Sequence, residues 1–216
     1  MSYRKGTITI YSKFFNLKEE RRERIINASL KEFARNGYDK ASTNEIIREA
    51  EISKGALFSY FKSKKGLYLF LIDYVLGIIQ KIYEQVDWEE TDLFKRLKAI
   101  GLIKFKTYKQ YPQAFDFLNS AAREDSAEVK GEIERFQKDM IESGFERGYR
   151  NIDWSKFRDD VDIQKALDII NWTILSFSEQ QRKNINTFAD TAAGLLDEWD
   201  VYFDILKRVF YKKEEQ

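Results

Sequence analysis

The chain has 216 residues with 43% hydrophobic and 15% aromatic side chains, and its one proline and ten glycines favour long helices over a many-stranded sheet. It has no cysteine and no histidine, which excludes disulfides, thiol nucleophiles, and the commonest general base and metal ligand. The net charge of +1 hides an asymmetry, because residues 1–66 have a balance of +7 and residues 67–216 one of −6; a basic end suits phosphates, although a well-solvated surface has the same composition.

The first 17 residues are too apolar for a plain disordered tail. Their large apolar residues include Ile8, Ile10, Phe14 and Phe15, and their basic residues are Arg4, Lys5 and Lys13. One interpretation is a basic arm that reaches DNA through these cations. The other, which we favour, is an extension that folds onto the first helix or onto the body of the protein.

The first long helix is predicted at residues 18–36. Ile26, Leu30 and Phe33 recur there at spacings of four and three, which places them on one core-facing stripe. Gly37 is expected to end this helix in a left-handed conformation.

The next stretch holds two short helical patterns separated by a break. The first opens with Ser42 as an N-cap, and Glu45 is expected to reach back to the Ser42 N–H and complete a capping box. The second opens with Ser53 as a further N-cap, and Leu57 and Phe61 lie four residues apart on one buried face. A two-turn helix keeps its outward side chains available for contact. The pattern predicts a helix-turn-helix whose second helix has the right size for a DNA major groove.

This ordered set of residues resembles the tetracycline-repressor-like (TetR) family of bacterial transcriptional regulators. The family's pattern is a Gly-aromatic pair before a capped helix, then Ser-Lys-Gly, Leu-aromatic, an aromatic before Phe, and a Lys three residues further on. Here it reads Gly37-Tyr38, Ser42, Ser53-Lys54-Gly55, Leu57-Phe58, Tyr60-Phe61 and Lys64. The rest of the chain matches only in its all-helical layout.

The resemblance implies an all-α protein of about nine helices. It implies an N-terminal extension at residues 1–17, a three-helix helix-turn-helix DNA-binding domain at 18–66, and a helical effector-binding and dimerisation domain at 67–216.

The resemblance also assigns roles on the second short helix. Lys54 would reach a guanine edge or a phosphate, while Gly55 and Ala56 would allow close approach to the groove, with Ala56 able to touch a thymine methyl. Tyr60 and Lys64 would bind backbone phosphates. Each of these side chains could instead be a solvated surface residue.

Three further positions belong to the same implied surface. Thr43 and Asn44, at the start of the preceding helix, match positions that meet phosphate or base with help from the helix dipole. Phe58 stands where the family usually has Tyr, so a phenolic phosphate contact is replaced by apolar contact or by packing. Glu51 stands where a turn Gly is common; it disfavours positive φ, and its charge would repel phosphate if it faced DNA.

The remainder of the chain is expected to form six helices. Ser63 caps the first, at 64–85, which is apolar on more than one face and is expected to connect the two halves. Pro112 suits the first turn of a new helix, and residues 151–153 are expected to form a loop. The other five helices are predicted at 91–110, 112–122, 126–149, 160–182 and 187–212.

The body shows no catalytic pattern, no phosphate-cradling glycine loop and no dinucleotide fingerprint, so we expect no enzyme activity and no cofactor. It is instead dense in aromatic residues. The resemblance implies a pocket there for a hydrophobic or aromatic effector, although the same side chains could merely fill the core. The residues assigned to this pocket are Phe105, Tyr108, Tyr111, Phe115, Asn119, Phe136 and Trp172.

The last two predicted helices carry more apolar residues than a solvent-facing pair should. These residues are Ile169, Trp172, Leu175 and Phe177 on one helix, and Leu195, Leu196, Trp199, Phe203 and Leu206 on the other. The resemblance implies a four-helix bundle across a two-fold axis, which would place two recognition helices about one DNA turn apart on an inverted repeat.

The sequence therefore predicts a homodimeric DNA-binding regulator, and repression is the favoured role. Binding of an effector is expected to release the protein from operator DNA. One rival is a helical small-molecule-binding protein or carboxylate-based enzyme with an incidental helix-turn-helix; another keeps DNA binding but has a filled body. No signal peptide is visible, and the apolar run at 67–79 contains Asp73 and is too short to span a bilayer. We expect a cytoplasmic protein without a membrane partner.

Overall fold

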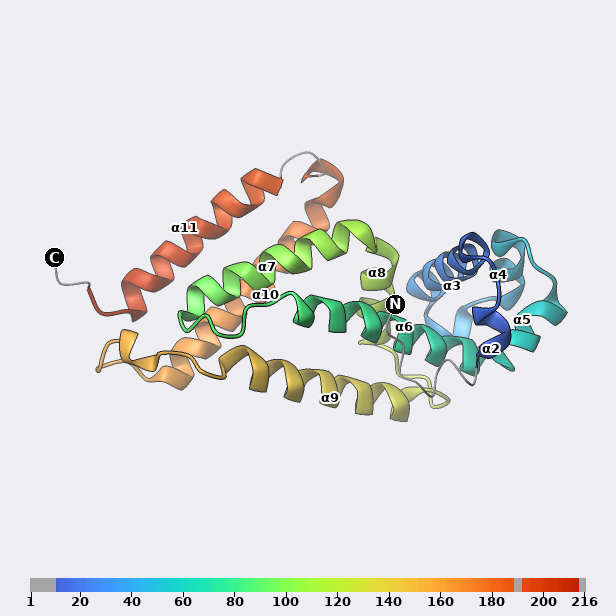
Figure 1. Cartoon of the computed structure of the whole chain (residues 1–216), viewed down its shortest axis with the longest axis horizontal. Helices are drawn as coiled ribbons and strands as arrows, with labels where there is room; N and C mark the ends of the chain where they lie inside the picture. The colour runs from blue at the N-terminus through green and yellow to red at the C-terminus, as the bar shows by residue number, and fades with distance from the viewer. Residues whose placement is uncertain (1–10, 189–191, 214–216) are drawn as a thin grey trace. The chain divides into compact units, whose positions relative to one another are not determined.

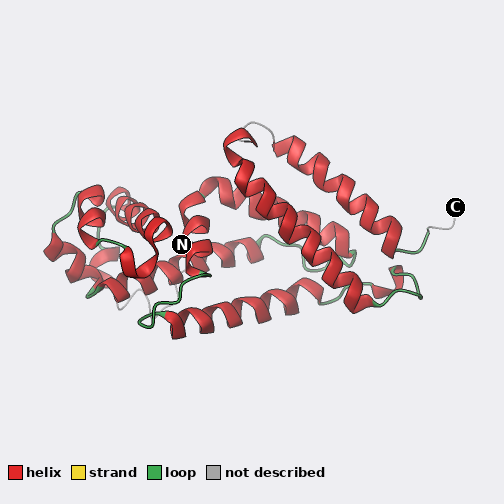
Figure 2. Ribbon diagram, turned by 180° about the vertical axis from the view of Figure 1, so that it is seen from behind, coloured by secondary structure: helices red, strands yellow, loops and turns green. Residues whose placement is uncertain are grey.

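The computed structural model describes residues 11–188 and 192–213. Within those ranges the chain is helical and forms no β-strand, and nine of the helices have seven or more residues, which confirms the all-α prediction (Figures 1 and 2). The elements in chain order are α2 (Ser12–Phe15), α3 (Glu19–Lys40), α4 (Thr43–Ala50), α5 (Lys54–Phe61), α6 (Lys64–Glu84), α7 (Leu93–Gln110), α8 (Pro112–Ala121), α9 (Lys130–Tyr149), η1 (Trp154–Lys156), α10 (Ile163–Phe188) and α11 (Ala192–Phe210).

The chain divides into two compact units. The first contains residues 1–86 and 103–147, and the second contains residues 87–102 and 148–216. The helix-turn-helix belongs to the first unit together with α6, α8 and most of α9. Helices α10 and α11 belong to the second unit, and α7 contributes its first half to the second unit and its second half to the first.

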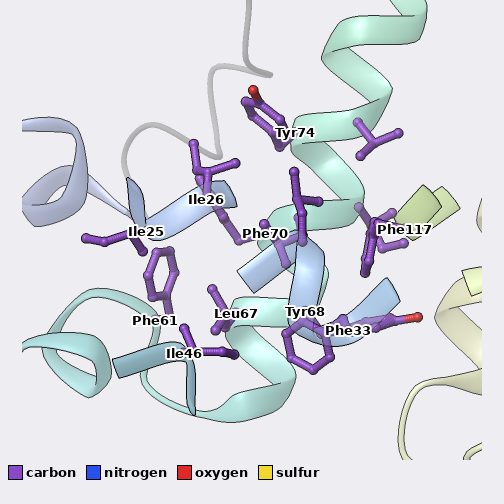
Figure 3. Close-up of a cluster of buried hydrophobic side chains, with 14 of the residues drawn as sticks. Ile25, Ile26, Phe33, Ile46, Phe61, Leu67, Tyr68, Phe70, Tyr74 and Phe117 are labelled. Carbon is purple, nitrogen blue, oxygen red and sulfur yellow. The ribbon is translucent and has the colours of Figure 1, made fainter. Parts of the chain in front are cut away.

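The first unit is built around an apolar core to which α2 to α6, α8 and α9 contribute. Phe61 of α5 lies among Ile25 of α3, Ile46 of α4 and Leu67 of α6 (Figure 3). Phe117 of α8 closes the other side of this core, with its ring centroid 5.1 Å from that of Tyr68 and 6.3 Å from that of Phe33. The short helices α4 and α5 are therefore held by burial in a shared core.

Serine hydroxyls begin three helices of the first unit, as the sequence predicts. Ser42 Oγ accepts from the Glu45 N–H at 3.4 Å, Ser53 Oγ from the Ala56 N–H at 3.2 Å, and Ser63 Oγ from the Gly66 N–H at 2.9 Å. Each bond satisfies one backbone donor that the first turn of a helix leaves without a partner.

The predicted capping box at Ser42 is wrong in its second half. The Ser42 N–H donates to Glu32 Oε1 of α3 at 2.8 Å, and Glu45 pairs with Arg48 instead. Because a carboxylate from the neighbouring helix already accepts from this N–H, Glu45 is free to form an ion pair on its own helix.

Gly37 has the predicted positive φ of 67°, but its ψ of −178° is not left-handed helical, and it does not end the helix as predicted: it lies at a kink inside α3, which continues to Lys40. The adjacent Tyr38 N–H donates to Glu124 Oε2 at 2.5 Å, and a Cβ at Gly37 would lie 3.2 Å from the same oxygen. Ser126 Oγ donates to Asp39 Oδ1 at 2.7 Å. The loop between α8 and α9 is thus hydrogen-bonded to the point where α3 turns toward the helix-turn-helix.

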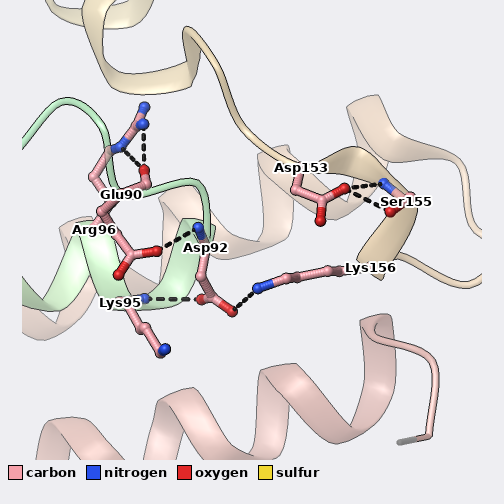
Figure 4. A network of polar contacts seen from close by, with 7 residues as sticks. All are labelled: Glu90, Asp92, Lys95, Arg96, Asp153, Ser155 and Lys156. Carbon is pink, nitrogen blue, oxygen red and sulfur yellow. Dashed lines mark hydrogen bonds and ion pairs between the residues drawn. The ribbon is translucent and has the colours of Figure 1, made fainter.

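The second unit has its own apolar core and a buried cation. Arg96 of α7 is only 1% exposed, and its guanidinium donates to the carbonyl of Glu90 (Figure 4). It also donates to the carbonyls of Trp88, Gly148 and Arg150. Asp92 stands one position before α7, where its Oδ1 accepts from the Lys95 N–H at 3.0 Å and its Oδ2 from Lys156 Nζ at 2.9 Å. These contacts tie the start of α7 to the segment after α9.

Helix α6 is long and apolar enough to cross a membrane by length and composition alone. This differs from the expectation that the apolar run at residues 67–79 is too short to span a bilayer. However, 56% of its apolar window is buried inside the protein, and the buried side chains include Leu67, Phe70, Leu71 and Val75. The helix is therefore a core helix of the first unit.

Candidate nucleic-acid interface

Helix α5 exposes one side and buries the other. Leu57 and Phe61 are 2% and 1% exposed, while Lys54 and Gly55 at its N-terminal end are exposed. Nothing lies within 4 Å of the position that a Cβ on Gly55 would occupy, so the backbone there is open to an approaching ligand. Phe58, one turn after Lys54, is half-buried. The exposed side of α5 thus begins with the Lys54 cation, followed by the accessible backbone of Gly55.

The turn after α5 depends on close packing at Gly66. A Cβ on this residue would collide with the Phe61 carbonyl oxygen at the end of α5. The absence of a side chain therefore lets α6 begin directly against α5 and fixes the direction in which the outer face of α5 points.

Three predicted DNA contacts also have partners within the protein. Ala56 is partly buried against the core, and the Tyr60 ring lies 6.2 Å from the ring of Phe61. Lys64 Nζ donates to the Asp39 carbonyl at 3.1 Å and lies 4.9 Å from the centre of the Tyr38 ring. Lys64 would have to exchange this carbonyl for a phosphate, so the exposed Lys54 is the stronger candidate.

The start of α4 adds a second part to this surface. Thr43 is half-buried and Asn44 is exposed in the first turn, where free backbone N–H groups favour an anion. Glu51, at the C-terminal end of α4, adopts the left-handed conformation with φ 54° and ψ 47°, against the expectation from its side chain. Its carboxylate forms an ion pair with Arg24 at 2.5 Å, which neutralises the charge expected to repel phosphate.

The segment before α3 and Ser59 of α5 meet in a contact that no local pattern of the sequence predicts. In the structure, residues 11–17 fold, and Lys13 Nζ donates to Ser59 Oγ of α5 at 3.5 Å. The apolar pair Phe14-Phe15 indicates that this segment packs against the protein. The sequence does not indicate that Phe14 packs near Tyr60, because the two residues are far apart along the chain. The basic residues Arg4 and Lys5 lie outside the described residues.

The predicted pocket residues of the first unit lie on α7, α8 and α9, except for Tyr111, which lies between α7 and α8. Tyr108 of α7 and Phe115 of α8 have ring centroids 5.6 Å apart, and Lys109 Nζ lies 5.1 Å from the centre of the Phe105 ring. Phe136 of α9 is 8% exposed within the core. The remaining two, Tyr111 and Asn119, are half-buried.

Trp172 stands apart from the other predicted pocket residues. It lies in the second unit and is 66% exposed on α10. It shares its exposure with other large apolar residues of α10 and α11, which are Ile169, Leu175, Val201, Tyr202, Ile205 and Val209. Of the predicted dimer residues, Phe177, Phe203 and Leu206 are buried within the unit, Trp199 is half-buried, and the side chains of Leu195 and Leu196 lie outside the described set.

Comparisons with known proteins agree with this geometry. Residues 25–70 match the family model described as bacterial regulatory proteins, tetR family. The uncharacterized HTH-type transcriptional regulator YuxN of Bacillus subtilis (strain 168) is 30% identical over 132 residues, which are 59% of this chain and 43% of YuxN. The chain thus spans less than half the length of this curated relative.

Solved structures resemble the chain over most of its length. A TetR family transcriptional regulator from Chloroflexus aurantiacus J-10-fl has a TM-score of 0.64 at 27% identity, covering 94% of this chain and 98% of that one. The regulator FadR from Bacillus subtilis in complex with stearoyl-CoA has a TM-score of 0.55 at 18% identity, covering 85% and 96%, and shows likeness of fold alone. The helix-turn-helix, its matching family model and the shared fold agree: residues 25–70 match the TetR-family DNA-binding domain, and the chain as a whole has the fold of TetR-family transcriptional regulators.

Proposed function

We propose that the chain is a cytoplasmic, homodimeric repressor that binds an inverted-repeat operator and is released from it by a small hydrophobic or aromatic effector. The observation that carries the proposal is the division of α5, in which Leu57 and Phe61 are buried while Lys54 and Gly55 are exposed. The family is one of regulators and not of enzymes, which speaks against a carboxylate-based enzyme.

The dimer is supported by the apolar face of α10 and α11. Trp172 and Leu175 are 66% and 67% exposed, and Val201 of α11 is 59% exposed. A contiguous exposed apolar patch is unfavourable in water and marks an interaction site. An isologous pair of such faces would bury both and would present two copies of α5 to one duplex.

The effector site is supported by the aromatic residues on α7, α8 and α9. Lys104, next to Phe105 on α7, is an exposed cation, and an ammonium there would favour an effector with an anionic group. FadR, which shares the fold, was solved with stearoyl-CoA, an apolar chain on an anionic carrier.

The DNA-binding part is tested by selection from a random-sequence duplex pool with the full chain. We expect enrichment of an inverted repeat whose half-sites are centred about one helical turn apart, and a steep loss of affinity with salt. Recovery of no shared sequence, or binding without salt dependence, would exclude a sequence-specific regulator.

The effector part is tested on the complex with that selected duplex. Pairs of long-chain or aromatic carboxylates and their neutral alcohols are added, and the fraction of bound duplex is measured by fluorescence anisotropy. Release by at least one apolar compound is expected, more strongly by the carboxylate of its pair. A compound that binds the chain without changing its affinity for the duplex would contradict release by that ligand, because linkage requires reciprocal antagonism.

A further inference from the structure

Residues 11–17 lie outside the stretch that the family model matches, but they are packed into the first unit. Phe14 is 0% exposed, and its ring centroid lies 5.0 Å from that of Phe61 on α5 and 5.0 Å from that of Phe70 on α6. The Tyr11 hydroxyl donates to the Gly66 carbonyl at 3.2 Å. This segment, here called the N-terminal clasp (residues 11–17), therefore contacts both helices that meet at the end of the helix-turn-helix.

A third attachment comes from α3. Arg22 donates through one guanidinium nitrogen to the carbonyls of Phe15 at 2.8 Å and Leu17 at 3.2 Å. Hydrogen bonds from a charged donor are stronger than neutral ones. The clasp is thus held at both its side chains and its backbone, which sets it apart from a loose terminal tail.

Helix α5 is a helix that needs such support. It has eight residues, and helices of this length are not stable by themselves in water. Its own core anchors are Leu57 and Phe61, and the Phe14 ring packs on Phe61 and lies 6.1 Å from the ring of Tyr60. Contact with two successive residues of α5 limits both its rotation about its axis and its distance from α6.

The clasp also places a cation beside the exposed side of α5. Lys13 is exposed, and its Nζ donates to Ser59 Oγ at 3.5 Å. Ser59 lies one turn after Gly55, on the side of the helix away from Leu57 and Phe61. A lysine ammonium on a flexible stem is a point charge, so it suits a backbone phosphate better than a base edge.

We propose that the N-terminal clasp is a working part of the DNA-reading surface, in which Phe14 is a positioning residue for α5 and Lys13 binds a phosphate of the duplex backbone. The inference rests on the proposed function, because it needs a duplex that the chain recognises.

The phosphate contact is tested with Lys13→Ala in the full chain, on the duplex that the parent chain selects. Removal of one phosphate contact is expected to lower the slope of log affinity against log salt by about 0.9 and to weaken binding severalfold at 0.1 M salt. Lys130→Ala, at an exposed lysine of α9, is the matched control and should keep the parent slope. A Lys13→Ala slope equal to that of the control would overturn this role.

The positioning role is tested with Phe14→Ala and Phe14→Leu. Phe14→Ala is expected to lower the affinity ratio between the selected and a scrambled duplex by about tenfold, and Phe14→Leu, which keeps an apolar side chain, should recover most of that ratio. Circular dichroism and sedimentation confirm that each variant is folded. A folded Phe14→Ala protein that discriminates as well as the parent would overturn the role. If Phe14→Ala does not fold, the ratio for Phe14→Leu decides, because a positioning role predicts a partial loss there and a spectator predicts none.

The proposed function and the role of the N-terminal clasp can be overturned by different results. A parent chain that selects no duplex overturns the proposed function and this inference with it. A parent chain that selects a duplex, with clasp variants that match it in slope and discrimination, overturns the inference alone.

Discussion

At the residue scale, two positions of the helix-turn-helix bear on the proposed contact with DNA. Lys54 is an exposed cation at the start of α5, next to an open glycine. Glu51 ends α4 with a positive φ and is paired with Arg24. The first position provides charge toward a phosphate or a guanine, and the second removes a charge that would oppose it.

Lys54→Ala should weaken binding of the selected duplex about tenfold, because the variant loses a charged contact in the groove. The salt dependence measured by fluorescence anisotropy separates the two possible contacts. A slope lower by about 0.9 indicates a phosphate, whereas an unchanged slope with relaxed preference at one base pair indicates a guanine. Affinity and slope equal to those of Lys130→Ala would contradict a role for Lys54.

Glu51→Gly should raise the free energy of unfolding by about 0.5 kcal/mol, because relief of the left-handed conformation outweighs the loss of an exposed ion pair. Glu51→Ala is the matched control, since it loses the ion pair but keeps the unfavourable φ, and it should be less stable than the parent. Urea unfolding measures both. If glycine is no more stabilising than alanine at this position, the strain assigned to Glu51 is absent.

At the element scale, the ends of helices carry much of the specificity of the fold. The N-caps Ser42, Ser53 and Ser63 set where α4, α5 and α6 begin, and Glu124 in the loop after α8 binds the Tyr38 N–H at the interruption of α3. This loop gives α8 and α9 a contact with the end of α3, in addition to the connection through α6. In the second unit, Asp92 plays a comparable part at the start of α7.

Asp92→Asn should lower the free energy of unfolding by about 1.5 kcal/mol at pH 7, because it removes the charge that Lys156 and the Lys95 N–H stabilise. Burial pushes the pKa of Asp92 upward, but these two partners more than offset it, so the pKa lies below its usual value of 3.8. A folded pKa below the unfolded one means that the contribution is complete above about pH 4 and is lost as the pH falls through the folded pKa.

Urea unfolding of parent and Asp92→Asn at a series of pH values measures this contribution. The difference between them should be largest near neutral pH and should shrink below about pH 4. Asp160→Asn, which breaks an exposed pair with Arg158, is the control and should change little. A difference that stays constant down to pH 2 would show that the charge of Asp92 is not what stabilises the protein.

At the scale of the whole molecule, the apolar face on α10 and α11 is the feature that a lone chain leaves unexplained. Buried residues of the second unit, such as Phe203 and Leu206, already form its core, whereas Trp172 and Leu175 face solvent. The assignment of Trp172 to a partner chain therefore fits its exposure better than its assignment to the effector pocket.

Leu175→Glu should convert the proposed dimer into a monomer without unfolding it, because the side chain is 67% exposed in the single chain and would become an unpaired buried charge in the pair. Sedimentation equilibrium measures the mass. Gln113→Glu adds the same charge at an exposed position of α8 and should leave the mass unchanged. A Leu175→Glu protein with the parent's mass would place the interface elsewhere.

Local features were readable from the sequence and long-range ones were not. The three serine caps and the buried pair Leu57 and Phe61 depend on neighbours within one or two turns, and the structure confirms them, whereas Gly37 kinks α3 without ending it. Glu32 replaces Glu45 as the partner of the Ser42 N–H because tertiary packing brings α3 there. Lys13 contacts Ser59 for the same reason, and a contact between residues 46 positions apart cannot be predicted from the helical spacing of apolar residues.

The central claim is that two chains present two α5 helices to one duplex. It is tested most directly by measuring the affinity and stoichiometry of the full chain on the selected inverted repeat and on a duplex of equal length that keeps only one half-site. The account predicts two chains on each full site and binding to the half-site weaker by about 100-fold or more, because the second contact is intramolecular. One chain per duplex with equal affinity for both would contradict it.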